Sequence, residues 1–318
     1  INKRSIKETM KLSIIIPVYN SENILKELVN QITNEIQKIN NVSDYEIILV
    51  NDKSVDGSWQ IIEKICHENK YVAGIDLMKN VGQHNALIAG IKSSNFDYVI
   101  TMDDDLQHSP KFIEKIILKL NEGYDVCYTK YVNNKYSFFK KLGSIANDKI
   151  ANIVLQKPKN IYLSSFKGIN KNVANEIKKF SGPYVYLDGI ILDITRNIGT
   201  VDIDHEDRLD GKSNYNLNKL FSLWIKVFTN SSIYPLRIAS MSGFIITLIA
   251  TILALLIITN KLLNPEIQQG WTSIVVIILF FSGVQLLALG IIGEYLGRIF
   301  LNLNQKAQFT INKIIKNK

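Results

Sequence analysis

Two long segments without a charged residue lie close together near the C-terminus, and they restrict the possible folds more than any other feature. They run from 238 to 260 and from 267 to 293, and 271–293 is almost wholly apolar. A helix of this length, 23 residues, spans about 34 Å, which is enough to cross the roughly 30 Å hydrocarbon core of a bilayer. We therefore predict a transmembrane hairpin at 236–299, with spans at about 238–260 and 271–293. A pair of buried core helices is the alternative.

Positive charge flanks one side of this predicted hairpin. Arg237 precedes the first span and five basic residues follow the second, whereas the connecting loop holds one Lys and one Glu. By the positive-inside rule both ends of the chain, including the tail at 300–318, should lie in the cytoplasm. The sequence thus predicts a two-span protein of the cytoplasmic (inner) membrane. The amphiphilic stretch 302–318 could dock on a neighbouring copy, a question that the sequence leaves open.

The net charge of +8 is unevenly distributed along the chain. Residues 44–108 hold eleven Asp or Glu against five Lys, whereas 130–180 hold eleven Lys against two acidic residues. A basic block often binds nucleic acid, but beside a membrane anchor a lipid bilayer or a phosphate-bearing lipid is the better expected partner. For most single lysines a solvated surface is the alternative. The hydrophobic fraction of 47% excludes a disordered chain, and two cysteines exclude a disulfide framework.

Strand and helix patterns alternate along the first 130 residues. Short apolar runs typical of buried strands are separated by segments with apolar residues at helical spacing, which predicts an α/β fold with a mainly parallel sheet. The expected strands are 12–17, 45–50, 72–77, 98–102 and 125–129, and the expected helices are 22–37, 58–67, 84–93 and 112–120.

The polar residues that follow the expected strands predict the position of a binding site. Ligands of parallel sheets bind beyond the carboxyl ends of the strands. No G-x-G-x-x-G or Walker sequence follows the first strand, which argues against dinucleotide and P-loop sites. Three carboxylates, Asp103, Asp104 and Asp105, follow the fourth strand, and such a cluster is costly unless a cation neutralises it. Oxygen ligands of this kind suit Mg²⁺ or Mn²⁺ bridged to substrate phosphates; a surface acidic turn that caps the next helix is the alternative.

Several short motifs occur in a fixed order from the first expected strand to the hairpin. They are Ile16-Pro17-Val18-Tyr19-Asn20, Asp52 with Asp56-Gly57-Ser58, Asn80-x-Gly82, Met102-Asp103-x-Asp105-Leu106-Gln107, Arg208-x-x-Gly211-Lys212-Ser213-x-Tyr215 and Pro235-Leu236-Arg237. Each motif alone is weak. In this order, residues 10 to about 300 resemble a polyprenyl-phosphate glycosyltransferase of glycosyltransferase family 2, similar to bacterial undecaprenyl-phosphate sugar transferases and dolichyl-phosphate mannose synthases.

The resemblance implies the organisation of the whole chain. A cytoplasmic GT-A domain, which binds a nucleotide sugar, would occupy 1–215 and include an acceptor-side basic segment at about 130–160. An interfacial helix would follow at 216–235, before the hairpin. Two amphipathic segments flanked by lysines, 136–155 and 217–228, fit helices that lie in the membrane interface; ordinary helices packed on the sheet are the alternative. The family also implies a homo-oligomer, such as a tetramer.

The resemblance also assigns roles to single residues. The nucleoside of the donor would be held by Pro17, Tyr19, Glu22 and Asp52, with Asn80 and Gly82 beneath it and Asp104 near the ribose. The divalent cation on the donor diphosphate would be held by Asp103, Asp105 and Gln107. The phosphates would be bound by Arg208, Lys212 and Ser213, and the acceptor phosphate by Lys130 and Lys135. The expected catalytic residues are Asp105, Gln107 and Arg208.

The implied activity is the inverting transfer of one sugar from a nucleotide-diphosphate sugar, expected to be UDP-linked, to undecaprenyl or another polyprenyl phosphate. The product would serve glycosylation of the cell envelope. A lipid monophosphate is already ionised at neutral pH, so it needs no general base. Two alternatives are a processive polysaccharide synthase, whose Gln-x-x-Arg-Trp sequence is absent, and a non-catalytic membrane scaffold with a degenerate transferase domain. A nucleic acid is not expected as a partner.

Several residues depart from the family pattern, four of them in two short segments. Asn51 stands where many relatives have the first Asp of an Asp-Asp-Gly-Ser run, and Lys53 replaces the Gly. Ser165 and Lys167 stand where relatives often carry an Asp before a Phe and an Arg after it. These positions are expected to affect the nucleotide preference and the treatment of the acceptor.

Overall fold

A computed structural model describes residues 10–131, 158, 161–182, 185–203, 270–303 and 307–316, together with seven isolated positions between 241 and 263. The chain divides into two compact units. One consists of 1–214 with 307–318, and the other of 215–306.

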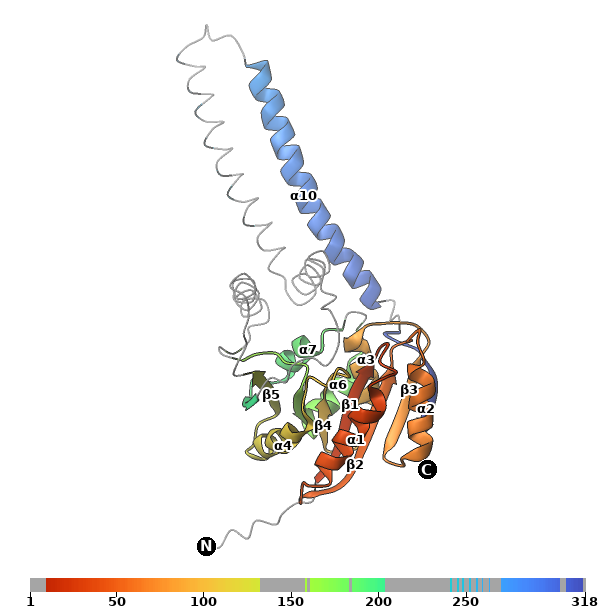
Figure 1. The fold of residues 1–318 in the computed structure, drawn as a ribbon. Helices are drawn as coiled ribbons and strands as arrows, with labels where there is room; N and C mark the ends of the chain where they lie inside the picture. The colour runs from red at the N-terminus through yellow and green to blue at the C-terminus, as the bar shows by residue number, and fades with distance from the viewer. Residues whose placement is uncertain are drawn as a thin grey trace, which may run out of the picture. The chain divides into compact units, whose positions relative to one another are not determined.

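The first unit is built on one eight-stranded sheet (Figure 1). Its strands, in the order in which they lie side by side, are β7 (Ile198–Ile203), β5 (Val126–Tyr131), β6 (Lys167–Asn170), β4 (Tyr98–Thr101), β1 (Met10–Val18), β2 (Val42–Asn51), β3 (Val72–Leu77) and β8 (Ile311–Lys316). The pairs β1–β2, β1–β4, β2–β3 and β5–β7 are parallel, whereas β6 and β8 run antiparallel to their neighbours. The predicted α/β class with a mostly parallel sheet is therefore confirmed.

Helices cover both faces of this sheet. Successive residues of β1 point to opposite faces, and accordingly Ile14 and Ile16 belong to one buried apolar cluster while Ile15 belongs to another. The first cluster includes α1 (Leu25–Ile36), α2 (Ser58–Glu68) and α4 (Ile113–Asn121), and α4 follows the short helix η1 (Pro110–Phe112). The second includes α3 (Gln83–Ser93), α6 (Lys171–Lys179) and α7 (Leu187–Ile194).

The apolar pattern of the sequence explains these elements. The middle of β1, an apolar run, is completely buried, as expected for a strand covered on both faces. In α1 the buried positions Leu25, Leu28, Ile32 and Ile36 recur every three or four residues and form one stripe. Burying each such side chain contributes about 1.5–3 kcal/mol relative to leaving it exposed. Local apolar spacing therefore suffices to place this central part of the fold.

The C-terminal tail contributes an edge strand that the sequence did not reveal. Within the stretch 302–318, β8 pairs antiparallel with β3 of the same chain, with Gly74 opposite Ile315 and Asp76 opposite Lys313. Lys313 also forms an ion pair of 2.7 Å with Glu63 of α2. Residues more than 230 positions apart thus meet at this edge of the sheet.

The second unit contains the long helix α10 (Trp271–Leu303), which has 33 residues. In the part of the chain that the structure describes, no helix meets the combined requirements of length and apolarity for crossing a membrane. The predicted span at 271–293 lies within α10, and neither span of the predicted hairpin is confirmed. The predicted interfacial segments 136–155 and 217–228 lie outside the described residues.

Candidate active site

Three loops meet beyond the carboxyl ends of β1, β2 and β4. The backbone N–H of Tyr19, just after β1, donates to Asp104 of the loop after β4 (3.2 Å). The N–H of Asn20 donates to the hydroxyl oxygen of Ser54 in the loop after β2 (3.1 Å), and that of Ser21 donates to Ser58 (2.9 Å). These contacts hold the three loops together.

Asp52 ties the loop after β2 to the segment that precedes α3. Asp52 is 4% exposed. Its carboxylate accepts hydrogen bonds from the backbone N–H groups of Val81 (2.7 Å) and Gly82 (2.8 Å). The side chain of Asn80 donates to the backbone carbonyl oxygen of Asp52 (3.1 Å). Burial raises the pKa of Asp52, and the two N–H groups act in the opposite direction. Gly82 adopts φ +86°, a conformation that favours glycine, immediately before α3. The structure thus brings together three residues predicted to lie around the nucleoside.

Glu22 supports the same loop from the other side. Its carboxylate accepts a hydrogen bond from the N–H of Gly57 (2.6 Å), and its own N–H donates to Asp56 (3.3 Å). A Cβ on Gly57 would come within 2.5 Å of the Glu22 carboxylate oxygen, so a side chain at position 57 would displace this contact. Pro17 lies buried within β1, and Tyr19 is 50% exposed at its end.

The acidic residues after β4 point in two directions. Asp104 turns toward the loop after β1 and accepts from the Ser21 hydroxyl (2.5 Å). Burial raises the pKa of Asp104 to about 6; hydrogen bonds from Ser21 and Tyr19 act to lower it, and the charges of Asp103 and Asp105 add to the increase.

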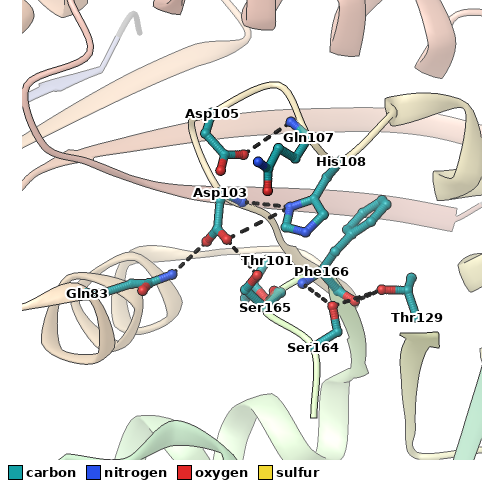
Figure 2. Close-up of polar contacts among 10 residues, drawn as sticks. All are labelled: Gln83, Thr101, Asp103, Asp105, Gln107, His108, Thr129, Ser164, Ser165 and Phe166. Carbon is teal, nitrogen blue, oxygen red and sulfur yellow. Dashed lines mark hydrogen bonds and ion pairs between the residues drawn. The ribbon is translucent and has the colours of Figure 1, made fainter. Parts of the chain in front are cut away.

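Asp103, Asp105 and Gln107 lie close to one another in the loop after β4 (Figure 2). Gln107 donates its N–H to Asp105 (3.1 Å), and Leu106 between them has φ +59°, which makes the turn tight. Figure 2 shows the Gln107 side chain beside Asp105, with Asp103 next to them. Asp103, Asp105 and Gln107 thus offer two carboxylates and one amide oxygen within five consecutive residues. Among the described residues, no group of three or more His, Cys, Asp or Glu is placed to hold a metal ion.

Two neutral side chains orient Asp103, and the sequence analysis did not identify either of them in this role. Gln83 donates to one carboxylate oxygen (2.6 Å) and Ser165 donates to the other (2.6 Å). The carbonyl of Ser165 in turn accepts from Thr101 at the end of β4 (2.7 Å). An Asp at position 165, which many relatives carry, would here place a second carboxylate against Asp103 in place of a hydrogen-bond donor.

Lys167, another departure, is a buried residue of β6. It is 1% exposed and forms an ion pair with Asp188, which is 6% exposed. The Tyr128 hydroxyl donates to the same carboxylate (2.8 Å), and the Lys167 ammonium lies 4.9 Å from the centre of the Tyr128 ring. Burial raises the pKa of Tyr128 well above its ordinary value, so the hydroxyl stays a donor.

The predicted phosphate-binding residues are mostly outside the described part of the chain. Lys130 is exposed near the end of β5. Lys135, Arg208, Lys212 and Ser213 lie outside the described residues, so their predicted roles stay predictions.

A mostly parallel sheet with polar loops gathered beyond the carboxyl ends of its strands is an arrangement that binds ligands at that edge. The model of the family described as "Glycosyl transferase family 2" matches residues 13–178, which is more than half of the chain. The chain belongs to this family, and the resemblance identified from the sequence is confirmed.

Relatives with described activities match nearly the whole chain. The undecaprenyl-phosphate 4-deoxy-4-formamido-L-arabinose transferase of Proteus mirabilis is 30% identical over 96% of this chain and 94% of its own length. The enzyme of the same name from Aeromonas hydrophila has the same identity and coverage. Among solved structures, the glucosyl-3-phosphoglycerate synthase of Mycobacterium tuberculosis in complex with Mn²⁺, UDP and phosphoglyceric acid has a TM-score of 0.52 at 16% identity and covers 69% of this chain and 76% of its own. That likeness is one of fold.

Proposed function

We propose that this protein transfers one sugar from a nucleotide-diphosphate sugar, most simply a UDP-sugar, to undecaprenyl phosphate or another polyprenyl phosphate. The observation that carries the proposal is the turn at 103–107, which presents Asp103, Asp105 and Gln107 beside the loops after β1 and β2 in a family 2 chain. The relatives named for undecaprenyl-phosphate sugar transfer support the acceptor class, because they match the chain from end to end rather than only the catalytic domain.

The donor set on this turn fits Mg²⁺ or Mn²⁺. Asp103, Asp105 and Gln107 offer hard oxygen atoms from a short segment, and substrate phosphates would complete the coordination of such an ion. When bound, the cation would neutralise the donor diphosphate and the charge that develops on it as it leaves. Gln83 and Ser165 fix the orientation of Asp103 before any ligand arrives, which reduces the reorganisation that binding requires.

The nucleoside is proposed to lie against the loops after β1 and β2. The half-exposed Tyr19 ring offers a surface on which a base can stack. The hydrogen bonds from Val81 and Gly82 to Asp52 fix the position of the loop after β2 relative to the start of α3. Asp104 holds the loop that carries Tyr19, which is compatible with its proposed position near the ribose.

The transfer itself follows from the charges of the two substrates. An oxygen of the acceptor phosphate attacks the anomeric carbon and forms the new C–O bond, while the bond to the donor diphosphate breaks and its electron pair leaves with the nucleoside diphosphate. Attack from the face opposite the leaving group inverts the configuration of that carbon. Lys130, with Lys135, Arg208 and Lys212, would offset the repulsion between the two anionic substrates.

We further propose that the segment 236–299 attaches the protein to the cytoplasmic membrane as a two-span hairpin, with the catalytic unit on the cytoplasmic face. The support comes from the two uncharged segments of the sequence. It also comes from α10, where large apolar side chains such as Ile278, Leu286 and Leu296 are more than half exposed within the chain.

A direct assay tests the proposed activity. Full-length protein would be incubated with a panel of radiolabelled UDP- and GDP-sugars, Mg²⁺ and undecaprenyl phosphate, and the lipid would then be extracted. We expect label in the lipid fraction with one donor, dependent on both Mg²⁺ and the acceptor. Label that remains in water with every donor would refute the proposed reaction.

A further inference from the structure

The C-terminal strand is connected to the candidate donor site by a chain of three polar side chains, of which Asn51 and Asp76 are buried and Asn312 is exposed. Asn312 of β8 donates its side-chain N–H to one oxygen of Asp76 in β3 (2.7 Å). Asn51, the last residue of β2, donates to the other oxygen of Asp76 (2.7 Å). Asn51 and Asp76 are 2% and 4% exposed, and they are direct partners in the β2–β3 pairing. These contacts link the edge of the sheet to the loop after β2.

The contact to Asp76 also fixes which way the Asn51 amide points. Because its nitrogen donates to Asp76, its oxygen faces the loop and accepts from the N–H of Ser54 (3.2 Å). The Ser54 hydroxyl then accepts from the N–H of Asn20 in the loop after β1 (3.1 Å). Lys53, inside this loop, has φ +56°, a conformation unfavourable for a residue with a side chain, so the loop needs such ties to hold its shape.

Asp76 also explains why position 51 departs from the family pattern. Among the residues that the structure describes, both hydrogen bonds to the Asp76 carboxylate come from neutral amides. An Asp at position 51 could still accept from Ser54, but it would place a second negative charge about 2.7 Å from Asp76, which is unfavourable unless the pair takes up a proton. Asn is the residue of the same shape that can donate in one direction and accept in the other.

We infer that Asn312, Asp76 and Asn51 form a positioning relay through which the C-terminal strand holds the nucleotide-binding loop. The residue after Asn51 is Asp52, whose carboxylate ties the loop to Val81 and Gly82. Loss of the hydrogen bond from Asn312 leaves the Asp76 carboxylate less well oriented. The Asn51 amide that donates to Asp76 is then held less firmly, and so is the loop that it orders. The C-terminal strand therefore acts on the candidate donor site through the loop after β2. The link to donor binding rests on the proposed function, whereas the link to loop order does not.

Two variants test the relay against a matched control. Asn312→Ala removes the first contact of the relay. Lys313→Ala, the control, removes the ion pair to Glu63 and weakens the attachment of the same strand without touching the relay. Hydrogen exchange of residues 51–58, measured by mass spectrometry without any substrate, should rise roughly three- to tenfold in Asn312→Ala, the size of effect expected for one hydrogen bond, and should not rise in Lys313→Ala. Equal exchange in both variants would overturn the inference.

An exchange of partners gives a second, independent test. Asn51→Asp alone should loosen the loop or prevent folding. Asn51→Asp combined with Asp76→Asn should restore it, because Asn at 76 donates to Asp at 51 and accepts from Asn312. Protected exchange at 51–58 in the double variant supports the relay, and failure of the double variant to recover protection contradicts it.

Ligand binding separates this inference from the proposed function. UDP with Mg²⁺ is the probe, measured by calorimetry. Its Kd should rise roughly three- to tenfold in Asn312→Ala, and the KM for undecaprenyl phosphate should stay unchanged. If the wild type binds no UDP while exchange at 51–58 rises in Asn312→Ala and not in Lys313→Ala, the proposed donor is refuted and the relay stands. Unchanged UDP affinity in Asn312→Ala would overturn the role of the relay at the donor site.

Discussion

The contribution of Lys167, a departure from the family pattern, to the stability of the protein can be tested sensitively. Its ammonium is buried against Asp188 and the Tyr128 ring. Lys167→Met keeps a side chain of similar length but removes the positive charge. The Asp188 carboxylate then stays buried, and of this cluster the Tyr128 hydroxyl still donates to it.

The cost of this change follows from charge burial. Removal of one partner of a buried ion pair costs about 3–5 kcal/mol, because the other charge stays in a medium of low polarity. Neutralising both partners, in Lys167→Met with Asp188→Asn, should recover most of that loss, because Asn can still accept from Tyr128. The exposed pair Lys171–Asp97 is the control, and Lys171→Met should cost less than about 1 kcal/mol.

Thermal unfolding of the full chain in mild detergent, followed by circular dichroism, measures these differences. At about 2–4 °C per kcal/mol for a domain of this size, Lys167→Met should lower Tm by roughly 6–20 °C, and the double variant should regain most of it. A loss in Lys167→Met no greater than that in Lys171→Met would refute the reasoning. So would a double variant whose loss equals the sum of the two single losses.

Three further predictions concern the site and its surroundings. Ser165→Ala should lower the affinity for Mg²⁺ roughly three- to tenfold in a titration of transfer activity, because Asp103 loses one of its orienting hydrogen bonds; an unchanged titration would argue against this role. Burial lowers the pKa of His84 in the folded protein. The neutral imidazole therefore contributes its full stability above the unfolded-state pKa of about 6.5, and this contribution is lost as the pH falls toward the folded-state pKa. The free energy of unfolding, measured from pH 7.5 to 5, should show this loss in the wild type and less of it in His84→Gln, and identical pH profiles would contradict the prediction. Replacing Lys130 and Lys135 together by Ala should raise the KM for polyprenyl phosphate more than that for the nucleotide sugar, and a change confined to the donor would show that the acceptor assignment is wrong.

The central part of the fold could be predicted because its signals are local. The apolar run of β1 and the helical spacing in α1 each reflect burial against the adjacent elements of one sheet. The strand β8 could not be predicted in the same way. Its sequence, Ile311–Lys316, mixes apolar and basic residues, and only the open edge of β3 decides where it pairs.

The candidate site shows the same division. The loops after β1, β2 and β4 could be located from the rule that ligands bind beyond the carboxyl ends of parallel strands. The reasons for Asn51 and Ser165 required the structure, because each donates a hydrogen bond to an Asp that is distant in sequence, Asp76 and Asp103 respectively. A side chain that serves a distant carboxylate leaves no periodic signal in the sequence.

The most direct measurement compares the wild type with Asp105→Asn in the transfer of labelled sugar to undecaprenyl phosphate at a series of Mg²⁺ concentrations. If the turn at 103–107 holds the cation on the donor diphosphate, the wild type forms labelled lipid only with the metal. Asp105→Asn should then lose at least about 100-fold in rate, the scale of an electrostatic contact at a reacting group, while its circular dichroism spectrum and Tm stay unchanged. Labelled lipid formed by Asp105→Asn at the rate of the wild type, or by the wild type with a chelator in place of Mg²⁺, would contradict the account.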